Sequence, residues 1–118
     1  MKLLDFFESA KTTDIDCIKV EMIEKKYNTS LPKIAQGIIS IVDEPLFIEE
    51  YRVISYSEIM NAEDDLHVAF TKMGIIPFVD CMDNDFIVYD FENKSWTRFN
   101  IVDKFKFGET GELEKIMK

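Results

Sequence analysis

Residues 74–102 constrain the fold more than any other stretch, because they read as three short strands joined by two tight polar turns. The strands are predicted over residues 75–79, 86–91 and 95–102. Runs of β-branched and aromatic residues separated by Asn- and Asp-rich turns are typical of a β-meander. The middle strand is apolar on both faces, which predicts a central position covered on each side. Pro77 lacks an amide donor, so the first strand is expected at an edge or at a bulge.

Two helices are predicted before this meander. Apolar residues recur at helical spacing over residues 14–27 and again over residues 32–42. Thr12 or Thr13 is in place to cap the first helix, and Asn28 can take the left-handed conformation that ends it. In the second helix, Gly37 leaves room for a neighbouring element to pack closely.

The remaining segments give weaker patterns. A short helix is predicted over residues 2–9. Apolar and polar residues alternate loosely over residues 47–56, which predicts one strand there. A helical segment follows that strand, and residues 67–73 fit either an extension of this helix or a further strand. Residues 103–111 are expected to be irregular, and residues 112–117 are predicted to form a terminal helix.

The length and composition fit one α+β domain over residues 1–118, with helices packed on a mainly antiparallel sheet. With 47% hydrophobic residues and ten Phe, such a domain can bury a core without metals or disulfides. Cys17 and Cys81 form no ligand spacing; a disulfide between them stays open, and a reducing cytoplasm is favoured. The first ten residues lack the apolar length of a signal peptide or a membrane span.

The negative charge is concentrated in the middle of the chain. Residues 43–92 carry thirteen acids against Arg52 and Lys72, whereas residues 1–42 are neutral and residues 93–118 are net basic. A negative field disfavours nucleic acid and favours encounter with a basic protein partner. The sequence therefore predicts a partner-facing surface made by six acidic residues of this segment: Glu49, Glu50, Asp64, Asp65, Asp83 and Asp85. The alternative is that these acids only keep the protein soluble.

No residue pattern predicts a catalytic, metal or cofactor site. The single histidine, His67, lies in no recognisable catalytic motif. Residues 80–85 have the acidity of a calcium loop but lack its glycine and its bidentate glutamate, so a strand-connecting turn is favoured.

Two further groups of side chains have both a structural and a functional interpretation. Aromatic residues in the strands could line a ligand pocket, although their spacing favours the core: Tyr51, Tyr89, Trp96 and Phe99. Basic residues near the C-terminus could form a small patch, although a solvated edge is favoured: Lys94, Arg98, Lys104 and Lys106.

The order of these signals resembles the SUKH superfamily, which includes yeast cell-wall glucan-synthesis regulators and many bacterial immunity proteins. Residues 23–27 (IEKKY) followed by Leu31-Pro32 are similar to that family's helix, short gap and Leu-Pro helix start. Residues 54–59 (ISYSEI) resemble its strand-to-helix step. Residues 75–79 (IIPFV) and 85–90 (DFIVYD) resemble two of its strands.

The resemblance implies helices packed on a mainly antiparallel sheet, no catalytic residues, and a binding role. In bacteria this role is commonly the neutralisation of a toxin by direct contact, here a basic toxin domain. A regulatory or scaffold module like the yeast relatives is the alternative, and the lack of long flanking segments argues against it. A small-molecule-binding domain is a further alternative, which polar residues converging in a deep pocket would favour.

Overall fold

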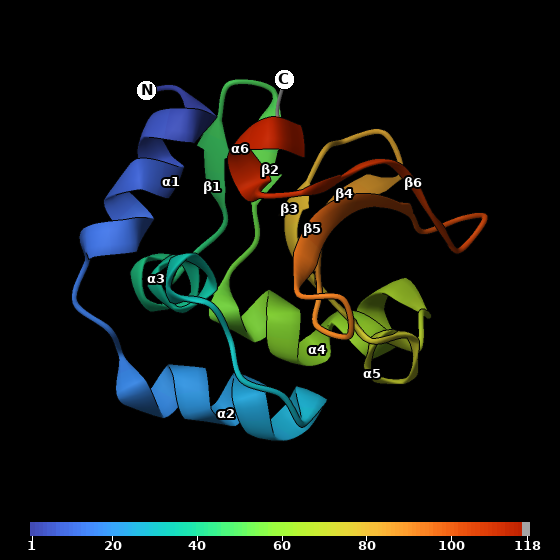
Figure 1. Cartoon of the computed structure of the whole chain (residues 1–118), viewed down its shortest axis with the longest axis horizontal. Helices are drawn as coiled ribbons and strands as arrows, with labels where there is room; N and C mark the ends of the chain where they lie inside the picture. The colour runs from blue at the N-terminus through green and yellow to red at the C-terminus, as the bar shows by residue number, and fades with distance from the viewer. Residues whose placement is uncertain (117–118) are drawn as a thin grey trace.

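A six-stranded antiparallel sheet forms the centre of the protein, in a computed structural model that describes residues 1–116 (Figure 1). The strands follow one another in chain order from one edge to the other. Their bounds are β1 Leu46–Ile48, β2 Tyr51–Val53, β3 Ile75–Asp80, β4 Asp85–Asp90, β5 Ser95–Asn100 and β6 Phe105–Gly111. The fold is therefore α+β, as the sequence predicts.

Six helices surround the sheet within the described residues. They are α1 Leu3–Thr12, α2 Cys17–Tyr27, α3 Lys33–Ile41, α4 Tyr56–Leu66, α5 Phe70–Met73 and α6 Leu113–Ile116. α2 packs on α3, and α1 packs along α3 as well. The main helix contacts with the strands are made by α4 and α5 on β3 and by α6 on β5 and β6. The first three helices thus build a layer beside the sheet (Figure 1).

The predicted meander is confirmed as β3, β4 and β5, which are adjacent and antiparallel. β4 lies in the interior of the sheet, and its residues 86–90 are all buried. β3 is also an interior strand, and its register with β4 shifts between Pro77 and Val79. Of the two predicted ways to accommodate Pro77, the bulge is the one that occurs, since the missing amide donor falls where the ladder is interrupted.

The prediction of one strand over residues 47–56 is wrong. The chain reverses at Glu49 and Glu50, so that Ile48 pairs with Tyr51 in the β1–β2 hairpin. Glu49 takes the left-handed conformation, with φ at 55°, which is uncommon for a residue with a side chain. Its carboxylate Oε1 accepts a hydrogen bond of 2.8 Å from the Leu3 amide at the start of α1. This long-range contact helps to hold a turn that carries no Gly or Asn.

The prediction of irregular structure over residues 103–111 is also wrong, because residues 105–111 form the edge strand β6 paired with β5. The pairing is irregular, with a register shift between Trp96 and Arg98, and this strand has mostly exposed residues. The terminal helix predicted over residues 112–117 is present as α6, while Met117 lies outside the described residues.

Helix ends follow local hydrogen bonding. α2 begins at Cys17 because the Asp16 carboxylate accepts the Lys19 amide at 3.2 Å, so the predicted start at residue 14 and the Thr12 or Thr13 cap are wrong. Asn28 ends this helix in the left-handed conformation, as predicted. The open question over residues 67–73 is resolved by a left-handed His67 that ends α4, followed by the single turn of α5.

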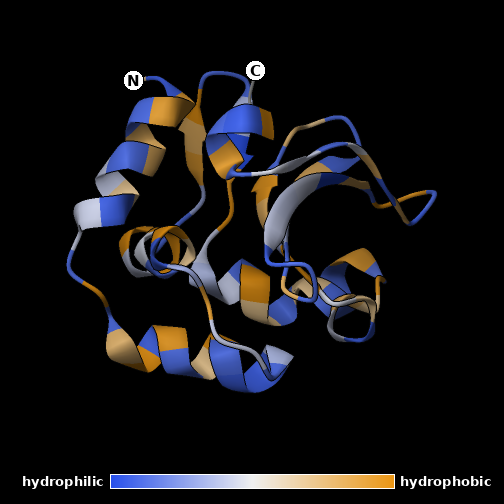
Figure 2. Cartoon of the chain, in the orientation of Figure 1, coloured by the Kyte–Doolittle hydropathy of each residue, from blue (hydrophilic) through white to orange (hydrophobic). Residues whose placement is uncertain are grey.

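One hydrophobic core connects helices and strands. The alternation of hydrophobic and hydrophilic residues along the outer helices is visible in Figure 2. Ile38, Phe78, Val88 and Trp96 are all buried in this core. Cys17 and Cys81 are both free thiols. Within residues 1–116, no helix has the length and apolarity needed to cross a bilayer.

Replacing Gly37 with alanine is expected to destabilise the protein by about 1–3 kcal/mol, as other overpacking changes do. A Cβ atom at this position would lie 1.8 Å from the Ala10 carbonyl oxygen, so α3 and α1 must separate. The better helix propensity of alanine offsets only part of this cost. Urea melts check the result, with Ser9→Ala on the exposed face of α1 as the control. Equal stability of Gly37→Ala and the parent would contradict the close α1–α3 contact.

Candidate functional site

The six carboxylates predicted to form one surface lie at two ends of the sheet. In an antiparallel sheet with strands in chain order, the β1–β2, β3–β4 and β5–β6 turns share one end. Glu49 and Glu50 lie in the first of these turns, and Asp83 lies in the second. Asp64 and Asp65 instead lie in the last turn of α4, which leads from the opposite end of β2 to the start of β3. The two groups therefore lie on different elements, and the prediction of one surface made by all six stays a prediction.

Two of the predicted residues have a structural contact of their own. The Glu49 carboxylate accepts the Leu3 amide, as described above. Asp85 begins β4 and accepts a hydrogen bond of 3.1 Å from the side-chain amide of Asn100 on β5. These two carboxylates hold elements together. Glu49 is exposed, as are Glu50 and Asp83, whereas Asp85 is half-buried.

We use the name turn edge for residues 49–50, 81–84 and 101–105. The last two turns are joined, because the Ile101 amide donates to the Asn84 carbonyl oxygen at 2.9 Å. The turn edge exposes three apolar side chains: Met82 at 59%, Val102 at 64% and Phe105 at 48%. The same three turns carry the exposed carboxylates of Glu50, Asp83 and Asp103, together with the exposed ammonium of Lys104. Apolar side chains with a rim of charge are the usual make-up of a protein contact surface.

Sequence reasoning missed the part of the turn edge between β5 and β6. The signal for a turn was present in Asn100, whose side-chain oxygen accepts the amides of Val102 at 2.9 Å and Asp103 at 2.8 Å. An Asn that bonds the backbone two and three residues later is a recognised turn former. It would have placed Val102 and Asp103 beside the predicted acids of the β3–β4 turn.

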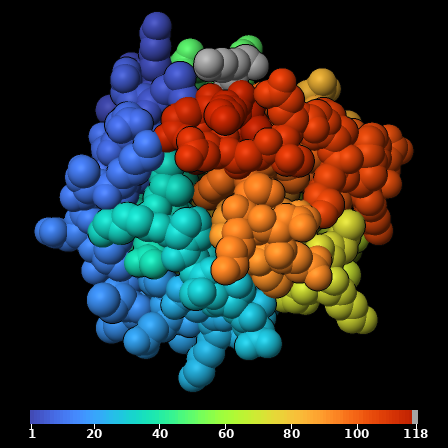
Figure 3. All heavy atoms as spheres, in the orientation of Figure 1, coloured from blue at the N-terminus to red at the C-terminus, as the bar shows by residue number. Residues whose placement is uncertain are grey.

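A groove of about 890 Å³ lies near the opposite end of the sheet. One wall is the segment before and at the start of α3, residues 30–34, together with Lys11 of α1. The other wall is formed by Tyr89, by residues 94–96 and by residues 111–114. Figure 3 shows this face, where the cyan, orange and red segments meet. The groove therefore separates the helical layer from the end of the sheet that carries the β4–β5 turn.

Two aromatic residues with polar atoms line the groove. Tyr89 and Trp96 are register partners on β4 and β5, with ring centroids 5.2 Å apart. Their exposed fractions are only 5% and 4%. Within the described residues, the structure gives neither the Tyr89 hydroxyl nor the Trp96 indole N–H a hydrogen-bond partner. Burial, followed by the nearby charge of Asp90, raises the pKa of Tyr89, so its hydroxyl stays protonated and can donate.

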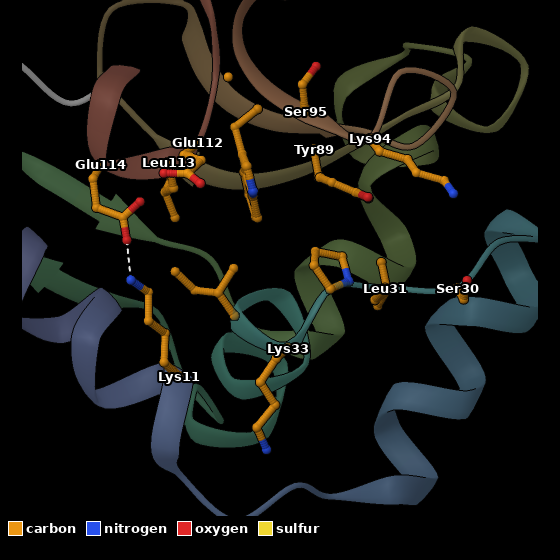
Figure 4. A pocket seen from close by; sticks show the side chains of 14 residues that line it. Lys11, Ser30, Leu31, Lys33, Tyr89, Lys94, Ser95, Glu112, Leu113 and Glu114 are labelled. Atoms are coloured by element: carbon orange, nitrogen blue, oxygen red, sulfur yellow. Dashed lines mark ion pairs between the residues drawn. The ribbon is translucent and has the colours of Figure 1, made fainter.

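Charged side chains border the groove at both ends. Lys11 of α1 forms an ion pair with Glu114 of α6, which joins the two walls at one end (Figure 4). The bond from Lys11 is the main cause of the lowered pKa of Glu114. Lys94 lies at the other end, on the same side as the Tyr89 hydroxyl (Figure 4). Neither Lys33 nor Lys94 forms an ion pair within residues 1–116.

The sequence left two interpretations open for the strand aromatics and for the basic residues near the C-terminus, and the structure places both groups. Trp96 and Tyr89 line the groove from within the core, whereas Phe99 is fully buried against Phe70 with ring centroids 6.1 Å apart. The basic residues do not gather into a patch. Arg98 donates to Cys81 and to the Ile116 carbonyl.

The β3–β4 turn adopts the predicted turn geometry, with the Asp80 carboxylate accepting the Met82 amide at 2.8 Å. Across the described part of the chain, no three His, Cys, Asp or Glu side chains gather as metal ligands would. His67 is exposed at the end of α4.

No family model matches this chain, and searches of curated proteins and of solved structures return no match either.

Proposed function

We propose that this chain is a non-enzymatic protein-binding domain that neutralises a bacterial toxin by direct contact. The sequence support is the ordered set of motifs that resembles the SUKH superfamily. The single structural observation that carries the proposal is the turn edge, where Met82, Val102 and Phe105 are exposed among carboxylates. The compartment that fits the free thiols of Cys17 and Cys81 is the cytoplasm.

The two kinds of side chain have different roles in the proposed contact. Exposed apolar groups that become buried supply most of the affinity in protein interfaces. Carboxylates at the rim steer a basic partner and mainly change the association rate. The toxin surface that fits the turn edge is therefore basic with an apolar pocket. The acids of α4 lie outside this contact.

Neutralising the carboxylates of the turn edge is expected to slow toxin binding. The variant Glu50→Gln, Asp83→Asn, Asp103→Asn should lower the association rate at low salt by about tenfold and flatten its salt dependence. The candidate partner is first sought among the products of the neighbouring genes, and stopped-flow mixing with it at two salt concentrations measures the rate. The matched control is Asp64→Asn, Asp65→Asn at the opposite end of the sheet, which should leave the rate nearly unchanged.

The apolar residues are tested separately. Val102→Ser combined with Phe105→Ser should mainly speed dissociation, since lost contacts act on the off-rate. If both the acidic and the apolar variants bound and neutralised the toxin like the parent, the turn edge would not be the contact surface. If the parent chain did not bind the toxin at all, the proposed function would be wrong.

A further inference from the structure

The groove between the helical layer and the sheet has the properties of a ligand site. Its volume of about 890 Å³ lies within the usual range of small-molecule pockets. Leu31, Pro32, Ile34 and Leu113 supply apolar lining. The Tyr89 hydroxyl and the Trp96 indole N–H offer two donors from residues that are 5% and 4% exposed, and neither donor atom is among the buried polar atoms left without a partner in residues 1–116, so both are open to the groove. A ligand acceptor would replace water at these donors, for a net gain of about 0.5–1.5 kcal/mol per hydrogen bond.

We propose that this groove binds a small amphipathic carboxylate, with its apolar body against Trp96 and Leu113 and its carboxylate beside Tyr89 and Lys94. The site goes beyond the proposed function, because it lies at the end of the sheet opposite the turn edge. Failure of one proposal therefore leaves the other intact.

The shape of the groove favours a small molecule over an extended peptide. The ion pair between Lys11 and Glu114 joins the two walls at one end (Figure 4). A peptide strand that continues beyond the groove must break this pair, whereas a small ligand can end in front of it. The apolar part of the ligand then points toward the closed end, where Leu113 lines the wall.

The charges fix the orientation of the ligand. At the closed end, the negative charges of Glu112 and Glu114 disfavour the carboxylate of the ligand, and Lys11 is already paired with Glu114. At the open end, Lys94 has no ion-pair partner within the described residues, and the Tyr89 hydroxyl lies on the same side (Figure 4). An ammonium and a hydroxyl both donate hydrogen bonds to a carboxylate, and bonds to an ionised acceptor are stronger than those between neutral groups. The polar end of the ligand thus lies at the mouth of the groove.

Trp96 is the only tryptophan in the chain, so its fluorescence reports directly on the groove. The parent protein is titrated with octanoate and with 3-phenylpropanoate, and 1-octanol serves as the probe without a carboxylate. We expect a saturable fluorescence change with at least one acid, and a melting temperature that rises with its concentration because the ligand binds the folded state. The alcohol should bind more weakly by about tenfold or more.

The residues at the mouth are tested by Lys94→Gln and Tyr89→Phe, each expected to weaken binding of the acid by about tenfold. The matched control is Lys104→Gln. Lys94 and Lys104 both lie in hairpin turns with left-handed backbone, at φ of 53° and 58°, so the two changes disturb the turns alike. Only Lys94 borders the groove.

Three results would overturn the proposal. The first is the absence of a saturable change with either acid up to about 1 mM, the weak end of ligand affinities. The second is equal binding of 1-octanol and octanoate, which would indicate apolar partition without a carboxylate site. The third is equal weakening by Lys94→Gln and Lys104→Gln, because the effect would then come from lost positive charge anywhere on the protein.

Discussion

Replacing Phe78 with alanine is expected to lower the free energy of unfolding by about 3–5 kcal/mol, the range for buried aromatic residues. Phe78 is fully buried on the interior strand β3. Its ring meets Trp96 of β5 with centroids 5.1 Å apart and an interplanar angle of 61°. This edge-to-face contact links two strands that flank β4. The truncation therefore leaves a cavity at the centre of the sheet that the rigid strands cannot close.

Phe47→Ala is the matched control, since the same side chain is removed where it is 69% exposed on β1. Its cost should stay within about 0.5 kcal/mol. Urea melts followed by Trp96 fluorescence and by far-ultraviolet circular dichroism measure both variants. A loss below about 1 kcal/mol for Phe78→Ala, far under the usual cost of a buried aromatic, would contradict the strand assignment on which the fold depends.

Replacing Asp90 with alanine is expected to cost about 3 kcal/mol, because a buried charged acceptor with four hydrogen bonds is lost. Its side chain is 3% exposed at the end of β4. The amides of Glu92 and Asn93 donate to it at 3.1 Å, the Asn93 side chain at 2.7 Å and the Lys106 ammonium at 2.9 Å. Asp90 thus holds the β4–β5 turn and ties the edge strand β6 to it. Asp83→Ala, in the exposed β3–β4 turn, is the control and should be nearly neutral.

The pH dependence of stability gives a second readout for Asp90. Desolvation alone would raise the pKa of this carboxyl, and the hydrogen bonds from Asn93 and Lys106 outweigh it, so the pKa is lowered on folding. Its stabilisation is therefore present above the unfolded value of about 3.9 and is lost as the pH falls through the folded pKa. Asp90→Asn should flatten the loss of stability below about pH 4. If Asp90→Asn lost stability at acidic pH as the parent does, the carboxylate would not be held as described.

The parts of the fold that the sequence predicts are those with local causes. Alternation and turn residues place β3, β4 and β5, and Asn28 marks the end of α2 because its short polar side chain tolerates the left-handed conformation. The β1–β2 turn could not be predicted in this way. Glu49 and Glu50 are poor turn formers, and the partner of Glu49 is an amide 46 residues away in the sequence.

The edge strand β6 could not be predicted from its local sequence either. Its sequence, Phe-Lys-Phe-Gly-Glu-Thr-Gly, has two glycines, a Lys and a Glu, which weaken the strand signal of its two Phe and its Thr. It forms because β5 offers a free edge and because Lys106 reaches Asp90. Tertiary context overrides local preference in such strands.

The candidate sites were predictable only in part. Charge counting finds Glu50 and Asp83, but the separation of Asp64 and Asp65 from them depends on which end of the sheet each turn occupies. In the groove, strand pairing places Tyr89 beside Trp96. The opposite wall, residues 30–34, comes from a distant segment whose position only the packed structure provides.

The central claim, that the turn edge contacts a toxin, is tested most directly by nuclear magnetic resonance of the labelled chain. The ¹⁵N amide spectrum is recorded alone and with an unlabelled toxin domain that the chain neutralises. We predict that the amides of residues 81–84 and 101–105 shift or broaden on binding, while those of α2 and of Asp64 and Asp65 stay in place. Changes confined to α2, α4 or the groove, with the turn edge unaffected, would contradict the claim.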